Sequence, residues 1–244
     1  MLDFGANKHG LIVYGGESST DYGIVVSEAP SFDKPVRKNT VNKIPGRNGA
    51  VIFQEDAYED VARSYKAWIA DYAREDLVSA VSDFTAWLYS KKGYQRLEDN
   101  FEPDIYRLAY FDGGENITNE LTQYGSTVIR FTCRPERFLK EGEKEITVSN
   151  GDSIYNPTRF DSKPLIYIEG SGEIHVSIKG ATIVANVDDY IYIDCERMNA
   201  YRLETENKNG EISGTFPVIA PGTNGIGITG SATKVVLVPR YFTI

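Results

Sequence analysis

Alternating apolar and polar residues in the second half of the chain predict short β-strands. Ile174, Val176 and Ile178 alternate with polar residues, which places three branched side chains on one face of a strand. Similar apolar runs occur at 183–187, 190–195 and 234–238, separated by turn residues. No helix-length periodic segment interrupts these runs, and their spacing is typical of a β-sandwich or a small barrel.

Pairs of asparagine or aspartate with glycine indicate turns along the whole chain. These residues tolerate the positive φ that type I′ turns require, so between apolar runs such pairs predict antiparallel hairpins. The pairs are Asn48-Gly49, Asp112-Gly113, Asn150-Gly151, Asn209-Gly210 and Asn224-Gly225. The chain is therefore predicted to be mainly β.

One amphipathic helix is predicted in the first half. Its apolar stripe consists of Leu77, Val81, Phe84 and Leu88, which share one face of a helix of about four turns. Acidic residues at 75–76 precede the stripe and lysines at 91–92 follow it. The helix dipole favours this distribution of charge, which strengthens the prediction.

The charged segment from Arg134 to Glu145 contains a proline and a glycine, and it predicts a domain boundary. We place the junction near Leu139. The first domain then covers residues 1–139 and the second covers residues 140–244. We predict that the helix belongs to the first domain and that the second is a β-sandwich.

Composition narrows the class of function. Hydrophobic residues make up 41% of the chain and charged residues 25%, as in ordinary globular proteins. The net charge of −9 argues against a surface that grips nucleic acid, because neutralising phosphates needs clustered lysine and arginine. We interpret the basic runs at 34–43 and 91–96 as solvated loop faces. With no span long enough for a membrane helix and no signal peptide, we expect a soluble protein made in the cytoplasm.

The candidates for chemistry each have a simpler structural interpretation. We expect His9 and His175 to lie on the surface, and Cys133 and Cys195 to be buried free thiols, although a triad assembled in space stays open. The segment 225–230 matches G-x-G-x-x-G, but a strand-like run follows it instead of a helix, so turns and close packing explain it better.

Two further patterns also lack the context that their chemistry requires. Asp188, Asp189 and Asp194 do not have the spacing of an EF-hand loop, so we interpret them as a turn followed by a strand. The triplet at 116–118 is formally a glycosylation acceptor and is most simply a polar loop. We therefore predict no catalytic residue, no cofactor and no metal site.

Aromatic residues are numerous, with 16 tyrosines and 11 phenylalanines. Core packing is the default interpretation, since aromatic side chains enrich cores as well as interfaces. One group is hard to place in a single core and is the alternative candidate for a surface between subunits: Phe53, Tyr58, Tyr65, Trp68 and Tyr72.

Four stretches, in this order, together resemble the siphophage distal tail protein family. The first is the Pro45-Gly46-Arg47 turn followed by a strand-like run at 50–53. The second runs from Trp87-Leu88 through Gln95-Arg96-Leu97 and Pro103-Asp104 to Tyr106-Arg107-Leu108-Ala109. Asn150-Gly151 with the run 164–174 is the third, and the last comprises Gly214 to Pro217, Pro221 to Asn224, Gly230 and Pro239-Arg240-Tyr241. The resemblance extends from about Asp21 to Ile244.

The resemblance implies a structural protein of the tail tip in the virion of a phage or prophage, and not an enzyme. The first domain would be a tail-tube-like β-barrel or sandwich that forms a hexameric ring around a DNA channel, and the second a galectin-like β-sandwich. The implied partners are the major tail tube protein, the tape measure protein and the tail-associated lysin or fibre hub, with DNA only in transit and no membrane. Head-to-tail rings need two complementary edges. We predict that residues 48–68 contribute to the contact between neighbours, with Pro45, Gly46, Arg47, Phe53, Tyr58 and Trp68 as the interface residues.

Two other classes of function remain as alternatives. The second domain could be a carbohydrate-binding module that contacts host wall sugars through Tyr190, Tyr192 and Tyr201. An enzyme such as a wall hydrolase would require a cluster of titratable groups in a cleft. With two histidines and no metal-ligand spacing, the sequence gives the enzyme little support.

Overall fold

The structure, a computed structural model, describes residues 10–31, 34–70, 77–114, 118–121, 124–203 and 205–244. Within these ranges the chain is mainly β with one α-helix, which confirms the predicted fold class. The chain divides into two compact units, Met1–Arg137 with Ile244 and Phe138–Thr243. His9, Tyr72, the acidic pair at 75–76 and the start of the 116–118 triplet lie outside the described residues.

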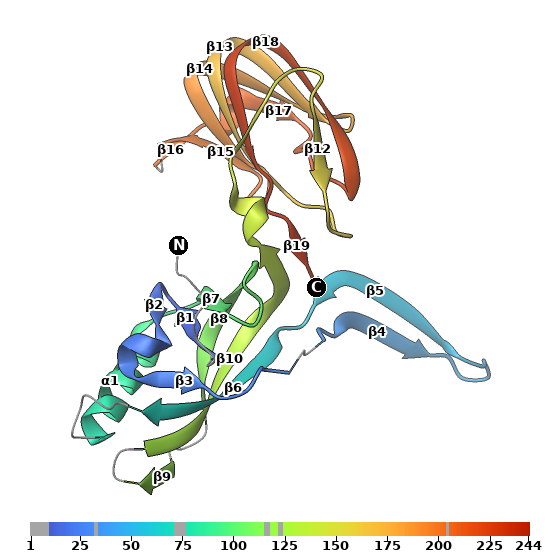
Figure 1. Cartoon of the computed structure of the whole chain (residues 1–244). Helices are drawn as coiled ribbons and strands as arrows, with labels where there is room; N and C mark the ends of the chain where they lie inside the picture. The colour runs from blue at the N-terminus through green and yellow to red at the C-terminus, as the bar shows by residue number, and fades with distance from the viewer. Residues whose placement is uncertain (1–9, 32–33, 71–76, 115–117, 122–123, 204) are drawn as a thin grey trace. The chain divides into compact units, whose positions relative to one another are not determined.

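The first unit combines one large sheet, one hairpin and the helix (Figure 1). Its elements are β1 (Ile12–Tyr14), β2 (Glu17–Ser18), the 3₁₀ turn η1 (Ser19–Tyr22), β3 (Ile24–Val26), β4 (Arg37–Lys43), β5 (Ala50–Tyr58), β6 (Val61–Ala70), α1 (Leu77–Ser90), β7 (Gln95–Asp99), β8 (Ile105–Gly114), β9 (Thr118–Leu121) and β10 (Tyr124–Leu139). The large sheet has the order β2-β1-β7-β8-β10-β6-β3, with β9 also paired to β10.

Helix α1 packs one face against this sheet, as its apolar stripe predicted. Phe84 and Leu88 are buried together with strand residues such as Tyr14 and Phe131. Trp87 stacks on Tyr22 with ring centroids 4.7 Å apart, and its indole N–H donates to the carbonyl of Tyr14. This aromatic packing gives the first unit its own core.

The second unit is built from a second antiparallel sheet (Figure 1). Its elements are the 3₁₀ turn η2 (Lys140–Glu143), β11 (Ile146–Val148), β12 (Ser153–Asn156), β13 (Leu165–Ile178), β14 (Ala181–Asp194), β15 (Asn199–Arg202), β16 (Glu206–Asn207), the 3₁₀ turn η3 (Asn209–Glu211), β17 (Ile212–Gly214), β18 (Gly222–Val238) and β19 (Phe242–Thr243). The strand order is β11-β18-β13-β14-β15-β16, with β12 on β18 and β17 on β14.

Strands β13, β14 and β18 carry the core of the second unit. Ile174, Val176 and Ile178 point inward and alternate with more exposed residues, as predicted. The buried isoleucines and valines of β14 and β18 pack against them, with Cys195 among them. Cys133 is buried in the first unit, so the prediction of two buried free thiols is confirmed.

Two of the predicted turns are wrong, because strands run through them. Asn224-Gly225 lies within β18 and Asp112-Gly113 within β8. Asn48-Gly49 and Asn150-Gly151 do lie between strands, as predicted, and so does Asn209-Gly210, which begins η3 between β16 and β17. A glycine-containing pair forms a turn only where neither flanking strand can continue its ladder.

The G-x-G-x-x-G segment is part of β18 and not a set of turns. Close packing, the other part of the prediction, does occur at Gly230, where φ is +98° and a Cβ atom would lie 2.3 Å from the Glu173 carbonyl oxygen. At this point the β13–β18 ladder shifts register between Gly170 and Ile174. Gly230 therefore permits a β-bulge at which the two strands approach closely.

Two charged segments also adopt regular structure. The basic run at 34–43, expected to be a loop, contains the whole of strand β4, and the segment 134–145 continues β10 to Leu139 before η2. In both cases backbone pairing overrides the charged composition. The side chains of β4 are mostly exposed, whereas those at 135–139 are half-buried. No helix among the described residues is long and apolar enough to cross a membrane.

Candidate functional site

Strands β4 and β5 form a separate two-stranded hairpin in the first unit (Figure 1). The register runs from the pair Arg37 and Tyr58 at the base to Lys43 and Ala50 beside the turn. Among the described residues, neither strand pairs with the large sheet. A two-stranded hairpin is marginally stable by itself in water, so this hairpin is a candidate for binding a partner.

Both faces of the hairpin carry exposed apolar side chains. Val41 and Ile52 are opposite each other on one face, and Phe53 lies on the other face. Ile52 and Phe53 each have an exposed fraction of 57%. Exposed apolar surface on both sides of a ribbon is typical of a segment that packs against another protein.

The predicted interface residues lie on two different elements. Pro45, Gly46 and Arg47 occupy the hairpin turn, where φ of Gly46 is +81°. Tyr58 lies at the hairpin base, and its hydroxyl accepts a 2.5 Å hydrogen bond from the Arg37 guanidinium. Trp68 belongs to β6 of the large sheet and is 39% exposed on the face opposite the core.

Tyr65 differs from its aromatic neighbours because it is fully buried in the first core. Its hydroxyl donates a 2.7 Å hydrogen bond to Asp99. Burial raises the pKa of Tyr65 well above its ordinary value. Of the aromatic group singled out in the sequence, Phe53 and Trp68 are thus the exposed members whose side chains the structure describes.

In the second unit, tyrosines form a row across the outer face of the sheet, which we call the tyrosine row. It contains Tyr167, Tyr192 and Tyr201 from three neighbouring strands, with Tyr190 beside them. Tyr192 stacks on Tyr201 with centroids 5.5 Å apart, and Tyr167 lies 5.0 Å from Tyr192. The guanidinium of Arg202 lies 4.8 Å from the centre of the Tyr190 ring.

The three candidate sugar-contact tyrosines are therefore neighbours, and Tyr167 is a fourth member that sequence reasoning missed. Its alternation with Ile166 and Ile168 indicates an outward side chain, but which strand lies beside it depends on a pairing that the sequence does not show. A hollow of about 200 Å³ adjoins the row and is lined in part by Tyr167, Tyr192 and Lys234.

The first unit also contains a group of five charged residues, four buried and Arg137 half-buried, which we call the arginine–carboxylate cluster: Arg63, Asp99, Glu102, Arg107 and Arg137. One guanidinium nitrogen of Arg63 lies 2.9 Å from both Asp99 and Glu102. Arg107 binds the same Glu102 oxygen at 2.6 Å, and Arg137 binds its other oxygen. Three arginines thus share one carboxylate.

The electrostatics of this cluster keep Glu102 ionised. Burial by itself would raise the pKa of Glu102, but the hydrogen bond and charge of Arg107, with the charges of Arg137 and Arg63, lower it below its ordinary value. For Arg63, burial acts to lower the pKa, while Tyr65 and Asp99 raise it above the usual range. Glu102 and Arg63 are therefore held in their charged forms at neutral pH.

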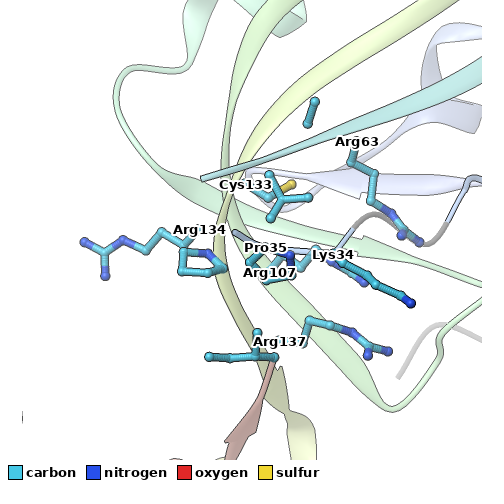
Figure 2. A pocket seen from close by; sticks show the side chains of 11 residues that line it. Lys34, Pro35, Arg63, Arg107, Cys133, Arg134 and Arg137 are labelled. Carbon is cyan, nitrogen blue, oxygen red and sulfur yellow. The ribbon is translucent and has the colours of Figure 1, made fainter. Parts of the chain in front are cut away.

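A pocket of about 390 Å³ opens beside the cluster (Figure 2). Arg63, Arg107 and Arg137 line it together with Lys34 and Cys133. Burial raises the pKa of the Cys133 thiol to about 11, so it is a poor nucleophile at neutral pH. Because arginine does not exchange protons there either, this pocket can hold an anion but offers little acid–base chemistry.

Among the other candidates, His175 is exposed, as predicted, with a nitrogen 2.9 Å from Glu173. Asp188 and Asp189 lie within β14, and Asp194 is bound by Arg240. In the part of the chain that the structure describes, no group of three or more histidine, cysteine or acidic residues could hold a metal ion.

The large sheet with its helix, the free hairpin and the second sheet make up a fold of the phage distal tail protein kind. The Dit protein of phage SPP1, whose crystal structure is described as a paradigm of the hub adsorption apparatus in phages infecting Gram-positive bacteria, has this fold. The likeness has a TM-score of 0.75 and covers 96% of this chain and 99% of that chain, at 14% sequence identity. It confirms the predicted resemblance at the level of the fold.

A chain in the structure of the phage p2 baseplate, in its activated conformation with strontium, is similar over 94% of this chain and 97% of that chain. The TM-score is 0.49 and the identity 13%. No protein-family model matches the sequence, and no curated protein matches it either.

Proposed function

We propose that this chain is a structural distal tail protein of a long-tailed phage or prophage. It forms a hexameric hub that joins the tail tube to the tail-tip fibre or lysin complex and lets DNA pass. The observation that carries the proposal is the likeness to SPP1 Dit over nearly the whole length of both chains. The first unit forms the ring and the second unit is the galectin-like domain.

The free hairpin is one reason to propose a ring. In a head-to-tail ring each subunit contributes two different surfaces to its neighbours. The hairpin supplies one such surface, because its exposed apolar side chains would be covered by the next subunit. Arg47 at its turn and Phe53 on its strand are the contacts that we propose. Trp68 on the exposed face of β6 is a further proposed contact.

The proposed partners follow from the same role. The ring contacts the major tail tube protein on one side and the lysin or fibre hub on the other, and the tape measure protein passes through it together with DNA. The net charge of −9 suits a lumen along which DNA slides without binding. The role is mechanical and needs no catalytic group, and the protein belongs to the virion.

The test of the ring contact is the double variant Arg47→Glu with Phe53→Ser. We expect it to fold but to lose most of the hexamer, because both substituted side chains lie on the hairpin outside the two cores. Light scattering of the purified chain gives the mass. The matched control is Lys92→Glu with Tyr155→Ser, which changes charge and exposed aromatic surface on elements other than the hairpin. An unchanged hexamer in the hairpin variant would reject the contact.

A second function, binding of wall sugars, is favoured by one observation, the tyrosine row and its adjoining hollow. Tyrosine rings with polar groups around them suit the faces and hydroxyls of a sugar. The test is a glycan array with the full chain and with Tyr192→Ala. Binding that is no stronger than millimolar, or equal in both proteins, would favour the scaffold alone.

A further inference from the structure

The pocket beside the arginine–carboxylate cluster has a lining of unusual charge. Five of the eleven residues that line it are cationic, and none is aspartate or glutamate. Figure 2 shows Arg134 pointing away from the others, whereas Lys34, Arg63 and Arg137 extend to one side. In a chain with a net charge of −9, this is a local reversal of sign.

The neighbouring carboxylates offset only part of this positive charge. Asp99 and Glu102 supply two negative charges, while Arg63, Arg107 and Arg137 supply three positive charges. The Lys34 ammonium adds a fourth cation to the pocket. A negatively charged group is therefore the complement that this pocket fits.

The arginines also keep hydrogen-bond donors for such a group. Arg63 and Arg107 have exposed fractions of only 4% and 7%, so their guanidinium groups are held in place. The buried Nε of Arg137 has no hydrogen-bond partner among the described residues. A buried donor without an acceptor is unfavourable, and the Arg137 side chain must turn before this nitrogen can meet an oxygen atom in the pocket.

We propose that this pocket binds an oxyanion, either phosphate or a carboxylate. Guanidinium groups bind both through paired, charge-assisted hydrogen bonds, and an ammonium group adds a point charge. Two sources supply this chemistry, a free phosphate ion and an acidic side chain of a second copy of the chain. Glu55 and Asp56 on the hairpin are exposed and suit the second source, which rests on the proposed ring.

The test measures binding of inorganic phosphate to the full chain by calorimetry at pH 7, against sodium chloride of equal ionic strength. We expect phosphate to bind where chloride does not. Lys34→Ala should raise the dissociation constant for phosphate about tenfold, since one charge-assisted contact is lost. Lys34 is exposed and stands outside the buried cluster, so this variant keeps the fold.

Lys92→Ala is the matched control, because it removes the same charge from an exposed position that does not line the pocket. It should bind phosphate like the parent protein. A second variant, Arg137→Lys, keeps the positive charge but loses the paired N–H donors of the guanidinium group. It should also bind phosphate more weakly than the parent protein. No heat beyond that of chloride, or equal affinity in the parent and both pocket variants, would overturn the proposal.

The two sources are separated by the mass of the assembly as phosphate is added at constant ionic strength. If a neighbour's carboxylate fills the pocket, phosphate competes with it and the mass falls, and Glu55→Gln with Asp56→Asn lowers the mass without phosphate. If the site takes a free ion, phosphate binds while the mass stays constant. If the chain binds phosphate but never assembles, the proposal of an oxyanion site stands and the proposal of a ring is rejected.

Discussion

At the scale of single residues, the most buried charges are held by arginines in both units. In the second unit Asp194 has an exposed fraction of 2%. Its two oxygens accept hydrogen bonds of 2.8 and 3.0 Å from Arg240, and backbone N–H groups of Glu196 and Arg197 donate to one of them. Burial by itself would raise the pKa of Asp194, but Arg240 lowers it.

Replacing Arg240 by leucine should therefore destabilise the chain strongly. The carboxylate of Asp194 would stay buried without its counter-ion, and we expect the free energy of unfolding to fall by about 3–5 kcal/mol. Arg197→Leu is the matched control, because Arg197 is exposed and lies 3.9 Å from the same carboxylate. That variant should change stability by less than about 1 kcal/mol. Urea denaturation measures both, and similar losses in the two variants would contradict the account.

Glu102 should make stability depend on pH in a defined direction. Its pKa is lower in the folded chain than its ordinary value of 4.5. Such a carboxylate stabilises the fold above the unfolded pKa, and this contribution is lost as the pH falls through the folded pKa. Glu102→Gln should thus be less stable than the parent at pH 7. The difference should shrink as the pH falls from about 5 toward 3.

Unfolding free energies across this pH range test that expectation. Glu98→Gln is the control. Glu98 lies close to Glu102 in the sequence, but it pairs with Arg96 and not with the three arginines of the cluster. A difference between parent and Glu102→Gln that stays constant with pH would show that Glu102 does not titrate as the cluster requires.

Sequence reasoning succeeded for residues whose environment is apolar or plainly solvated. The buried thiols Cys133 and Cys195 and the exposed His175 follow from alternation along their strands. The arginine–carboxylate cluster could not be found in this way, because Arg63 and Glu102 are 39 residues apart and meet only once the sheet is assembled. Arg63 does occupy an inward position of a strand, and that was the available signal.

At the scale of elements, helix α1 contributes stability through one face. Phe84 is buried beside Trp87, whereas Val78 is 75% exposed. Phe84→Ala should lower the free energy of unfolding by about 3–5 kcal/mol, because it removes a large buried side chain and leaves a cavity. Val78→Ala should change it by less than about 0.5 kcal/mol. Equal effects of the two substitutions in denaturant melts would contradict the claim that α1 stabilises the unit through one face.

Strand existence was easier to predict than strand length. The sequence divides residues 181–194 into two short strands, while the structure has one strand that continues through Asp188 and Asp189. Asp189 has φ of +78°, so the ladder accommodates a residue that resembles a turn. Pairing with β13 over the full length keeps this strand continuous. Such long-range pairing is invisible to local turn preferences.

The hairpin also shows that local structure can be predicted from the sequence while strand pairing cannot. Its turn at Asn48-Gly49 was predicted, because glycine with positive φ is a local property. That the hairpin pairs with no other strand in the described chain is a property of the assembled unit. The interface residues therefore remain a prediction whose test is assembly.

At the scale of the whole molecule, each unit has a core of its own. The order of short motifs along the sequence predicted the fold that SPP1 Dit shares, even though the identity between the chains is 14%. A fold persists at such identity because it needs only the pattern of buried positions and turns. Partner binding depends on particular surface residues, so it does not follow from the fold.

The central claim is that the chain works by assembling with copies of itself. The most direct test is the mass of the purified full chain, measured by light scattering over a range of micromolar concentrations. We predict a closed assembly of six chains whose mass does not grow with concentration, as a ring requires. A single chain at every concentration, or an open series of increasing mass, would contradict the account.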